Sequence, residues 1–488
     1  AQSPYRFSDI YDGETYDARL EEENSRKRQP VHLPDYPVSH IYAQMHEPVR
    51  ITEHLQPVQI IKTPKGETVI DFGQNMVGWA QVQVHGQRGE RVLLSFGEVL
   101  DKDGNFYNEN YRTAKNRVEY ILNGNGEECW HPHFAFQGFR YVRVEEFPCE
   151  VRLEHFTGVV IHSDMKRTGN FSCGNAEMNQ LFQNTMWGQR GNFVDVPTDC
   201  PQRDERLGWT GDAQVFIKTA ALNYGVAPFF EKWLTDLRSD QWENGGVPIV
   251  IPSVAGDVTS SAWSDAATIC PWELYRAYGD KRVLERQYDS MRAWVDYIRA
   301  QGEEEYLWNT GFHYGDWLAL DAAEGSYSGR TATDFIATVF FAHSAKLLYQ
   351  AAEVLGKTED AKTYQQLYDN IRRCFGEEFV TPRGRLTEDT QTAYVLALHF
   401  DLVENRQRAI ERLAELVREN DNKLTTGFVG TPYLCHALAD NGQAELAYSL
   451  VLQTEYPSWL YSVRQGATTI WEHWDGIMED GDFWSADM

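Results

Sequence analysis

The spacing of apolar residues changes once along the chain, and this change limits the folds that the sequence can adopt. From about residue 48 to 163 apolar and polar residues alternate; Ala80, Val82 and Val84, for example, are separated by polar residues. A period of two is expected of half-buried antiparallel strands. Because Gly and Asn turn signals recur roughly every 8–12 residues, this region predicts a β-sandwich.

From about residue 174 onward the period becomes helical. A long succession of helices joined by loops rich in Gly, Trp and Asp is typical of an (α/α)6 barrel, whose loops at one end build the site. A barrel of six hairpins needs twelve helices, and we expect one fewer. The eleven expected helices cover residues 174–190, 212–223, 226–240, 264–277, 281–300, 331–356, 358–376, 389–399, 403–418, 427–440 and 441–454.

The two patterns predict a multidomain chain that is all-β and then all-α. Residues 1–47 are polar and carry several prolines, which indicates a linker or the remnant of an upstream β module. Residues 48–163 are expected to form the β-sandwich domain, and residues 164–488 the barrel as the catalytic domain. This division agrees with a length of roughly 150 residues for a typical domain.

The composition excludes several classes of partner. Lys and Arg number 45 against 72 Asp and Glu, a formal charge of −27, which repels nucleic acid and anionic lipid surfaces. No run approaches the ~18 apolar residues of a membrane span. Aromatic residues make up 13% and suit sugar rings and packed cores alike. Seven scattered Cys without CxxC spacing indicate reduced, buried thiols rather than a disulfide framework.

The first residues do not resemble a secretory signal. They contain no basic segment followed by an apolar one, which favours a cytoplasmic location. Because the sequence begins with Ala1 rather than Met, a leader that has been removed would escape this test. A homodimer stays open, since the sequence carries no readable signature of oligomeric state.

The densest group of unusual residues is a loop between two expected helices. Asp199, Glu205 and Asp212 lie there with Arg203 and Arg206, among two prolines, two glycines and one tryptophan. Glycoside hydrolysis needs one carboxylic acid to protonate the leaving oxygen and a carboxylate that activates water or attacks the sugar. Repulsion between like charges can raise one pKa, while the arginines hold the other carboxylates ionised. The alternative is a salt-bridged helix entry.

This loop, Asp-Val-Pro-Thr-Asp-Cys-Pro-Gln-Arg-Asp-Glu-Arg-Leu-Gly-Trp, closely resembles the motif of bacterial α-L-rhamnosidases of glycoside hydrolase family 78. The resemblance implies an exo-acting, inverting hydrolase without metal or cofactor, which acts on rhamnosylated small molecules or oligosaccharides. It implies Glu205 as the general acid. The implied sugar-binding residues of this loop are Asp199, Arg203, Trp209 and Asp212.

A second segment, from Gly466 to Gly476, places Glu472 among aromatic residues. Glu472 resembles the general base of the same family, which would polarise a water molecule across the sugar from Glu205 at a carboxyl separation of roughly 6.5–9.5 Å. The alternative is that Glu472 binds backbone amides beneath two packing tryptophans.

Two further loops each pair a Trp with an Asp between expected helices. An aromatic face can cover the C5 methyl group of a deoxy sugar, while carboxylates accept bonds from its hydroxyls. Both loops resemble segments of the family, which implies apolar walls from Trp263 and Trp317 and hydroxyl ligands in Asp265 and Asp316. Taken alone, a Trp at a helix end is more often core packing.

The resemblance spans nearly the whole chain and departs from the family at its end. Segments 8–14 and 71–79 resemble sequences with a structural role before the barrel, whereas the family pattern continues after Glu472 into an Asn-His-Tyr segment and a final helix. We therefore expect a barrel that lacks its last helix. Two alternatives stay open: another α/α-barrel glycosidase, and a catalytically impaired rhamnose-binding protein.

A metal hydrolase is disfavoured by the spacing of the histidines. No HExxH or comparable pattern occurs. We expect His313 and His473, which lie near aromatic residues, to be hydrogen-bonded structural histidines or contacts of the sugar subsite.

Overall fold

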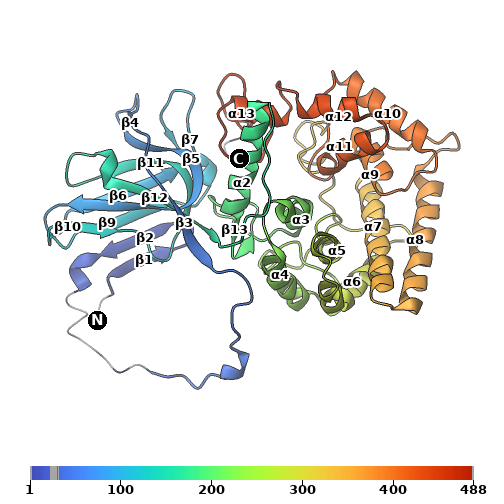
Figure 1. The fold of residues 1–488 in the computed structure, drawn as a ribbon, viewed down its shortest axis with the longest axis horizontal. Helices are drawn as coiled ribbons and strands as arrows, with labels where there is room; N and C mark the ends of the chain where they lie inside the picture. Colours follow the sequence, from blue (N-terminus) through green and yellow to red (C-terminus); the bar gives the residue numbers. More distant parts are fainter. Residues whose placement is uncertain (1–2, 22–29, 31, 486–488) are drawn as a thin grey trace. The chain divides into compact units, whose positions relative to one another are not determined.

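The computed structural model describes residues 3–21, 30 and 32–485 (Figure 1). The chain divides into two compact units. The first, called here the sheet unit, comprises Ala1–Asp164, Phe182–Arg206 and Gly466–Met488; the second, the helical unit, comprises Met165–Leu181 and Leu207–Gln465. The expected order of a sheet domain and then a helical domain is present, but two segments beyond residue 164 group with the strands.

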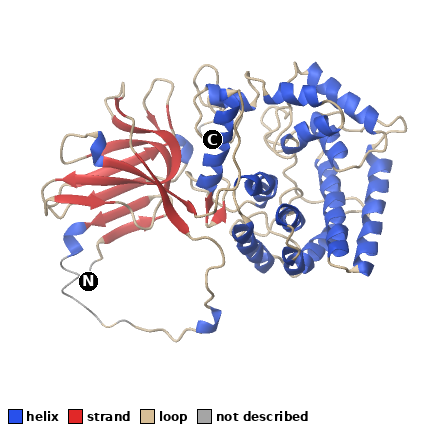
Figure 2. Cartoon of the chain, in the orientation of Figure 1, coloured by secondary structure: helices blue, strands red, loops and turns tan. Residues whose placement is uncertain are grey.

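Ten strands of the sheet unit form one large sheet (Figure 2). All of its strand pairs are antiparallel except β2 with β9. Two-stranded ladders join β7 (Val99–Leu100) to β8 (Phe106–Tyr107) and β13 (Phe193–Val194) to β14 (Val196–Pro197). The order in the large sheet is β1 (Tyr5–Asp9), β2 (Gly13–Asp17), β9 (Arg117–Ile121), β6 (Arg91–Gly97), β11 (Gln137–Glu146), β5 (Thr68–His85), β12 (Phe156–Ser163) and β3 (Val49–Leu55), with β4 (Gln59–Lys62) and β10 (Glu127–Trp130) also paired to β5.

The segment expected to be a linker or the remnant of an upstream β module contributes two strands to this sheet. Residues 5–17 form β1 and β2, and β2 pairs in parallel with β9, whose register joins Gly13 to Arg117. The Gly13 backbone has a φ of 108°, and a side chain there would meet the Arg117 carbonyl, so the close approach requires glycine. Tyr5–Asp9 and Gly13–Asp17 are therefore strands of the main sheet.

The long strand β5 curls the sheet because it pairs with different neighbours along its length. Its first residues pair with β4 and β11, and its last ones with β10 and β12. Between the pairs Tyr141 with Asp71 and Phe139 with Met76, β5 advances five residues while β11 advances two. Residues 72–75 therefore bulge from the ladder, and a bulge bends a strand and re-aims its side chains.

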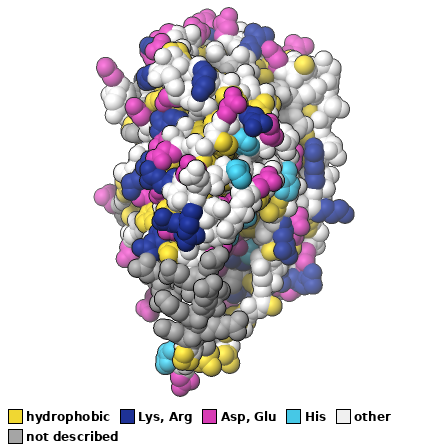
Figure 3. Space-filling model, turned by 90° about the vertical axis from the view of Figure 1, so that its left-hand side faces the viewer, with side chains coloured by type: hydrophobic (Ala, Val, Ile, Leu, Met, Phe, Trp, Pro, Cys, Tyr) yellow, Lys and Arg dark blue, Asp and Glu magenta, His cyan; other side chains and the backbone are white. Residues whose placement is uncertain are grey.

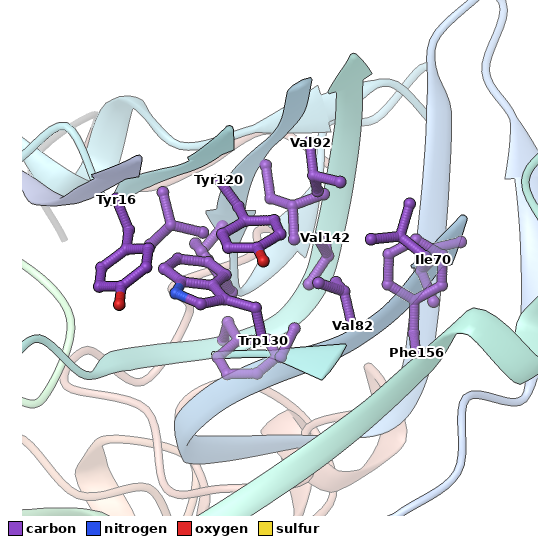
Figure 4. Packing of buried hydrophobic residues seen from close by; sticks show 14 of the residues in the cluster. Tyr16, Ile70, Val82, Val92, Tyr120, Trp130, Val142 and Phe156 are labelled. Carbon is purple, nitrogen blue, oxygen red and sulfur yellow. The ribbon is translucent and has the colours of Figure 1, made fainter. Parts of the chain in front are cut away.

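The core of the sheet unit follows the predicted alternation. Ala80, Val82 and Val84 are buried, whereas the polar residues between them are partly or fully exposed. Figure 4 shows Val82 with the rings of Tyr120 and Trp130, which are stacked with centroids 5.1 Å apart. Burying each large apolar side chain stabilises the fold by about 1.5–3 kcal/mol.

The described residues contain twelve α-helices, so the expected count of eleven is wrong by one. The eleven expected helices are all present, and the additional one is α13, which has six residues and follows Pro457. α2 is divided between the two units after Leu181. The helices are α2 (Ala176–Asn192), α3 (Thr210–Asn223), α4 (Ala227–Asp240), α5 (Ala266–Tyr278), α6 (Arg282–Arg299), α7 (Thr333–Val354), α8 (Thr358–Phe379), α9 (Gln391–His399), α10 (Arg406–Glu419), α11 (Thr431–Asp440), α12 (Ala444–Val451) and α13 (Trp459–Arg464).

The helices from α5 to α10 alternate between helices that are buried along much of their length and helices that bury one face. α5, α7 and α9 are buried along much of their length, whereas α6, α8 and α10 bury one face. α3 packs on α5, α5 on α7, α7 on α9 and α9 on α11, so alternate helices form one row. Within the described residues, no helix is long and apolar enough to cross a membrane.

The surface carries charges of both signs, and the cysteines differ in their exposure to solvent. On the visible face of the sheet unit, Lys and Arg are interspersed with Asp and Glu (Figure 3). All seven cysteines are free. Cys129, Cys149 and Cys173 are exposed, so the expectation of buried thiols is wrong for these three.

Candidate active site

The acidic loop after α2 is fixed to the sheet unit by Arg206. Its guanidinium donates to the carbonyls of Ile10 and Phe136, both at 2.9 Å, and to Asn116 Oδ1 at 2.9 Å. It also donates to the carbonyls of two loop residues. We expected Arg206 to hold acidic side chains ionised, but it donates to backbone carbonyls and to an amide oxygen. These acceptors satisfy the N–H groups of a buried guanidinium.

Arg203 is the centre of a cluster of charged side chains in the sheet unit. Its Nε donates to Glu205 Oε2 at 2.9 Å, and its Nη1 and Nη2 donate to Glu472 at 2.5 and 3.2 Å. Asp199 Oδ2 lies 3.6 Å from Nη2. Only 4% of the Arg203 side chain is exposed. We call Arg203, these three carboxylates and Arg112 the charge cluster.

The electrostatics of the charge cluster favour a permanent positive charge on Arg203. Burial lowers the pKa of Arg203, but the hydrogen bond to Glu472 and the negative charges of Glu472 and Glu205 leave the pKa above its ordinary value. A buried cation is stable only when its partners compensate for lost water, as these do. Arg203 therefore holds the two glutamates close to one another.

Arg112 is the member of the charge cluster that sequence reasoning missed. Its Nη1 donates to Glu205 Oε2 at 3.0 Å, so Glu205 contacts two guanidinium groups. Arg112 has a φ of 56°, which is uncommon for a residue other than glycine. No local pattern points to Arg112, because the contact joins residues 93 positions apart.

The segment that carries Glu472 is tied to the sheet unit at several points. Asn184 Nδ2 donates to the Ala467 carbonyl at 2.9 Å, and the Asn75 backbone N–H donates to Thr468 Oγ1 at 2.9 Å. Glu472 itself accepts from Arg203. Its observed partner is thus a guanidinium, which differs from the backbone amides of the alternative reading.

The predicted tryptophans of the helical unit meet around one tyrosine. Ring centroids of Tyr314 lie 6.1 Å from Trp209, 4.6 Å from Trp263 and 5.6 Å from Trp317. Trp263 is buried and also stacks on Phe428 at 5.1 Å. We call these five residues the aromatic cluster. Tyr314 was not singled out as a site residue in the sequence, although it lies next to the Asp-Trp pair that was.

Asp265 is enclosed in the helical unit rather than exposed to a pocket. Its Oδ2 accepts from the Ala262 N–H at 2.8 Å, and its Oδ1 accepts from Trp294 Nε1 at 3.0 Å and Ser344 Oγ at 2.6 Å. Burial raises the pKa of Asp265, against the effect of these hydrogen bonds. A buried carboxylate bonded on both oxygens serves to hold its neighbours.

Asp316 is enclosed in the same way. Its carboxylate accepts from the hydroxyl of Thr392 and from the N–H groups of Gly427, Val429 and Gly430 at 2.8, 2.9 and 3.1 Å. Burial raises the pKa of Asp316 as well. Asp316 thus joins its own loop to the starts of α9 and α11. Asp212, by contrast, lies half-buried in the first turn of α3.

The two histidines singled out in the sequence make local hydrogen bonds, and one group of side chains has the spacing of metal ligands. His313 accepts from the Ser261 N–H at 3.1 Å, and His473 Nδ1 lies 2.6 Å from Asp475, which fits the expected structural histidines. One group in the described residues, Asp199, Cys200 and Glu205, has ligand atoms within 4.8 Å of one another. Burial raises the pKa of the Cys200 thiol, so this thiol is protonated in the metal-free protein.

Comparison with known proteins identifies both parts of the chain. Residues 166–487 match the family model of the bacterial alpha-L-rhamnosidase 6 hairpin glycosidase domain, and residues 61–162 match the bacterial alpha-L-rhamnosidase concanavalin-like domain. An alpha-L-rhamnosidase of Formosa agariphila is 41% identical over 491 residues, which cover 97% of this chain and 52% of the relative. The chain spans about half the length of the curated relatives it matches.

Two solved structures agree with this match. The Streptomyces avermitilis alpha-L-rhamnosidase complexed with L-rhamnose has a TM-score of 0.92 at 40% identity, over 100% of this chain and 47% of that one. The native alpha-L-rhamnosidase from Aspergillus terreus has a TM-score of 0.95 at 36% identity, over 100% of this chain and 58% of that one.

Proposed function

Because the chain belongs to the bacterial α-L-rhamnosidase family, we propose that it releases terminal α-L-rhamnose from rhamnosylated small molecules or oligosaccharides. The observation that carries this proposal is the charge cluster, in which one buried guanidinium contacts both Glu205 and Glu472. Hydrolysis of an O-glycosidic bond needs such a pair of carboxyl groups.

In the proposed mechanism Glu205 is the general acid and Glu472 the general base of an inverting displacement. Glu205 gives a proton to the leaving oxygen, and Glu472 takes one from the water that attacks the anomeric carbon. The Glu472 side chain is 38% exposed and that of Glu205 18%, and the more exposed group suits the one that must reach water. Arg203 fixes the orientation of both.

The remaining predicted residues divide into two proposed roles. Asp199, Arg203 and Asp212 are proposed to bind sugar hydroxyls, and Trp209, Trp263 and Trp317 to face the apolar side of the sugar, as the family resemblance implies. For Asp265 and Asp316 the enclosed hydrogen bonds support a different role, which is to hold the loops that carry these tryptophans.

The finer architecture is part of the proposal. We infer that the helices form an (α/α)6 barrel, since the alternate helices α3, α5, α7, α9 and α11 pack in sequence as an inner row would. α13, the next alternate helix, is the candidate for the sixth member. We also infer that the sheet, curled at β5, folds over its own core as a two-layered sandwich.

The proposed function is tested by release of p-nitrophenol from p-nitrophenyl α-L-rhamnopyranoside. The parent chain is compared with Glu205→Gln and Glu472→Gln, and with Glu177→Gln as a control, because Glu177 is paired with Arg464 in the helical unit. We expect each of the first two substitutions to lower kcat roughly 10²- to 10⁴-fold and the control to leave it unchanged.

Other outcomes distinguish the alternatives. Turnover of a different aryl glycoside in a panel, with none of the rhamnoside, would assign another α/α-barrel glycosidase. Calorimetric binding of rhamnose by folded protein without turnover would assign a binding protein. Near-parental activity of Glu205→Gln would show that another group donates the proton.

A further inference from the structure

The bulge in β5 anchors the segment that carries Glu472. Residues 72–75 leave the ladder with β11, and Gln74 and Asn75 lie in this bulge. Gln74 Nε2 donates to the Thr468 carbonyl at 2.9 Å, and the Asn75 backbone N–H donates to Thr468 Oγ1 at 2.9 Å. The bulge therefore provides two hydrogen bonds to a residue four positions before Glu472.

The side chain of Asn75 links the same segment to a third carboxyl group. Its Nδ2 donates to Thr469 Oγ1 at 3.2 Å and to Glu98 Oε1 at 2.8 Å. An amide nitrogen carries two hydrogens, so these two bonds use both and set the orientation of the side chain. Asn110 Nδ2 lies 3.4 Å from the other oxygen of Glu98. Each Glu98 oxygen thus has an amide donor.

Glu98 follows β6 and interacts electrostatically with the charge cluster. Burial raises the pKa of Glu98 to about 7; the charge of Arg203 opposes this rise, and the charge of Glu472 adds to it. Tyr111 and Arg206 also interact electrostatically with Glu98. A change in its protonation therefore alters the field at Glu472.

We propose that Glu98 is a positioning residue for Glu472: its carboxylate orients the side-chain amide of Asn75, which donates to Thr469 at the start of the segment that carries Glu472. This inference rests on the proposed function, because it acts through the general base assigned there. A general base must be held within a fraction of an ångström of its productive position, so loss of the support lowers turnover more than binding.

The ionised form of Glu98 is the one that positions the segment. Within the described residues, Oδ1 of Asn75 and Oδ1 of Asn110 are buried and have no donor. A protonated Glu98 needs an acceptor for its O–H. Rotation of the Asn75 side-chain amide by half a turn would place Oδ1 of Asn75 beside Glu98 as that acceptor. Turning the Asn75 amide withdraws the donor from Thr469. Turnover should therefore decrease as the pH falls through the ionisation of Glu98.

The test is the pH dependence of kcat for the aryl rhamnoside, measured on the full chain between about pH 5 and 9. We expect the parent to lose kcat below the Glu98 ionisation, near pH 7. Glu98→Gln, which stays neutral, should lack that ionisation and have a kcat roughly tenfold or more below the parent at alkaline pH, with little change in KM. Glu98→Asp keeps the charge and should recover part of both the rate and the ionisation.

Glu128→Gln is the matched control, because Glu128 also accepts from neutral donors, Tyr120 and Asn123, in the sheet unit. It should keep the parental profile. A Glu98→Gln enzyme with parental kcat overturns the inference, and so does one whose kcat falls while the ionisation near pH 7 persists. If Glu472→Gln is inactive and Glu98→Gln is parental, only this inference fails; if Glu472→Gln turns over normally, the proposed function fails and this inference with it.

Discussion

The carboxylates of the charge cluster and the two aspartates of the helical unit differ in what compensates for their burial. Glu205 and Glu472 contact a guanidinium and keep part of their surface in solvent. Asp265 and Asp316 are almost completely enclosed and accept from hydroxyl, indole and backbone N–H donors.

This difference separates groups that can react from groups that hold structure. A partly exposed carboxylate beside a cation can exchange its partner for a sugar hydroxyl or a water molecule. An enclosed carboxylate cannot exchange its donors without leaving buried N–H groups unpaired, which costs about 1–3 kcal/mol for each group. Carboxylates thus have two different uses in this molecule.

The largest effect is expected for Arg203→Met, which removes the cation of the charge cluster. The three carboxylates would then repel one another, and Glu205 and Glu472 would lose their common orientation. We expect kcat/KM for the aryl rhamnoside to fall roughly 10³-fold, about 4 kcal/mol of transition-state stabilisation. Steady-state kinetics and a thermal melt on the same preparation measure it.

Arg143→Met is the matched control, because Arg143 is also partly buried and paired with two carboxylates, Glu67 and Glu145, in the sheet unit. It should lower the melting temperature and leave kcat/KM of the folded enzyme unchanged. Equal loss of activity in both variants would mean that Arg203 acts through stability alone, and the comparison above would fail.

The next effect is expected on stability, from Asp316→Ala in the helical unit. This substitution leaves three backbone N–H groups and one hydroxyl without their acceptor. We expect the free energy of unfolding to fall by about 3 kcal/mol or more, measured by urea denaturation. Asp316→Asn keeps one acceptor and should lose less, and the exposed Asp289→Ala should lose almost nothing. A normal stability with a raised KM would instead make Asp316 a sugar ligand.

The fold was predictable from the sequence where its signals are local. The helix expected over 331–356 is α7, Thr333–Val354, because long apolar faces determine it. α13 was missed because six residues hold less than two turns of periodicity. Strand β2 was missed because its parallel partner begins at Arg117, about a hundred residues away, and no local pattern records such a pairing.

The candidate site was predictable only in part, for the same reason. The motif around Glu205 is contiguous, so its resemblance to a family is readable. Arg112, Glu98 and Tyr314 reach their partners through contacts that have no sequence pattern. The sequence also cannot show that Asp265 and Asp316 are enclosed, because an Asp near a Trp has the same local pattern whether it is buried or exposed.

A smaller effect, on the pH dependence of stability, is expected from His313 in the helical unit. Burial lowers the pKa of His313 to about 4 from an ordinary 6.5. The unfolded chain therefore binds a proton between these pH values that the folded chain does not, so His313 lowers stability progressively as the pH falls from about 6.5 to 4. Compared with His313→Gln, the parent should lose about 3 kcal/mol more between pH 7 and 4.

The quantity to measure is the difference in the free energy of unfolding between the parent and His313→Gln. His343 and His399 also have lowered pKa values, but they contribute equally to both proteins. Urea denaturation at each pH provides it, with the exposed His54→Gln as a control. A difference that does not vary with pH would mean that the pKa of His313 is the same in the folded and unfolded chains.

The smallest effect is expected from Trp317→Ala, which tests whether the aromatic cluster binds sugar or only packs. Trp317 is partly exposed and contacts Tyr314 and Tyr327, so its removal should not collapse the helical unit. Loss of one aromatic face should raise KM for the aryl rhamnoside roughly tenfold, about 1.4 kcal/mol, with kcat less affected. Trp272→Ala removes an equally partly buried ring that contacts Tyr275 in α5, and should lower stability without changing KM. If both substitutions change only stability, the aromatic cluster is part of the core. Its rings would then stabilise the helical unit, as the enclosed aspartates Asp265 and Asp316 are proposed to do.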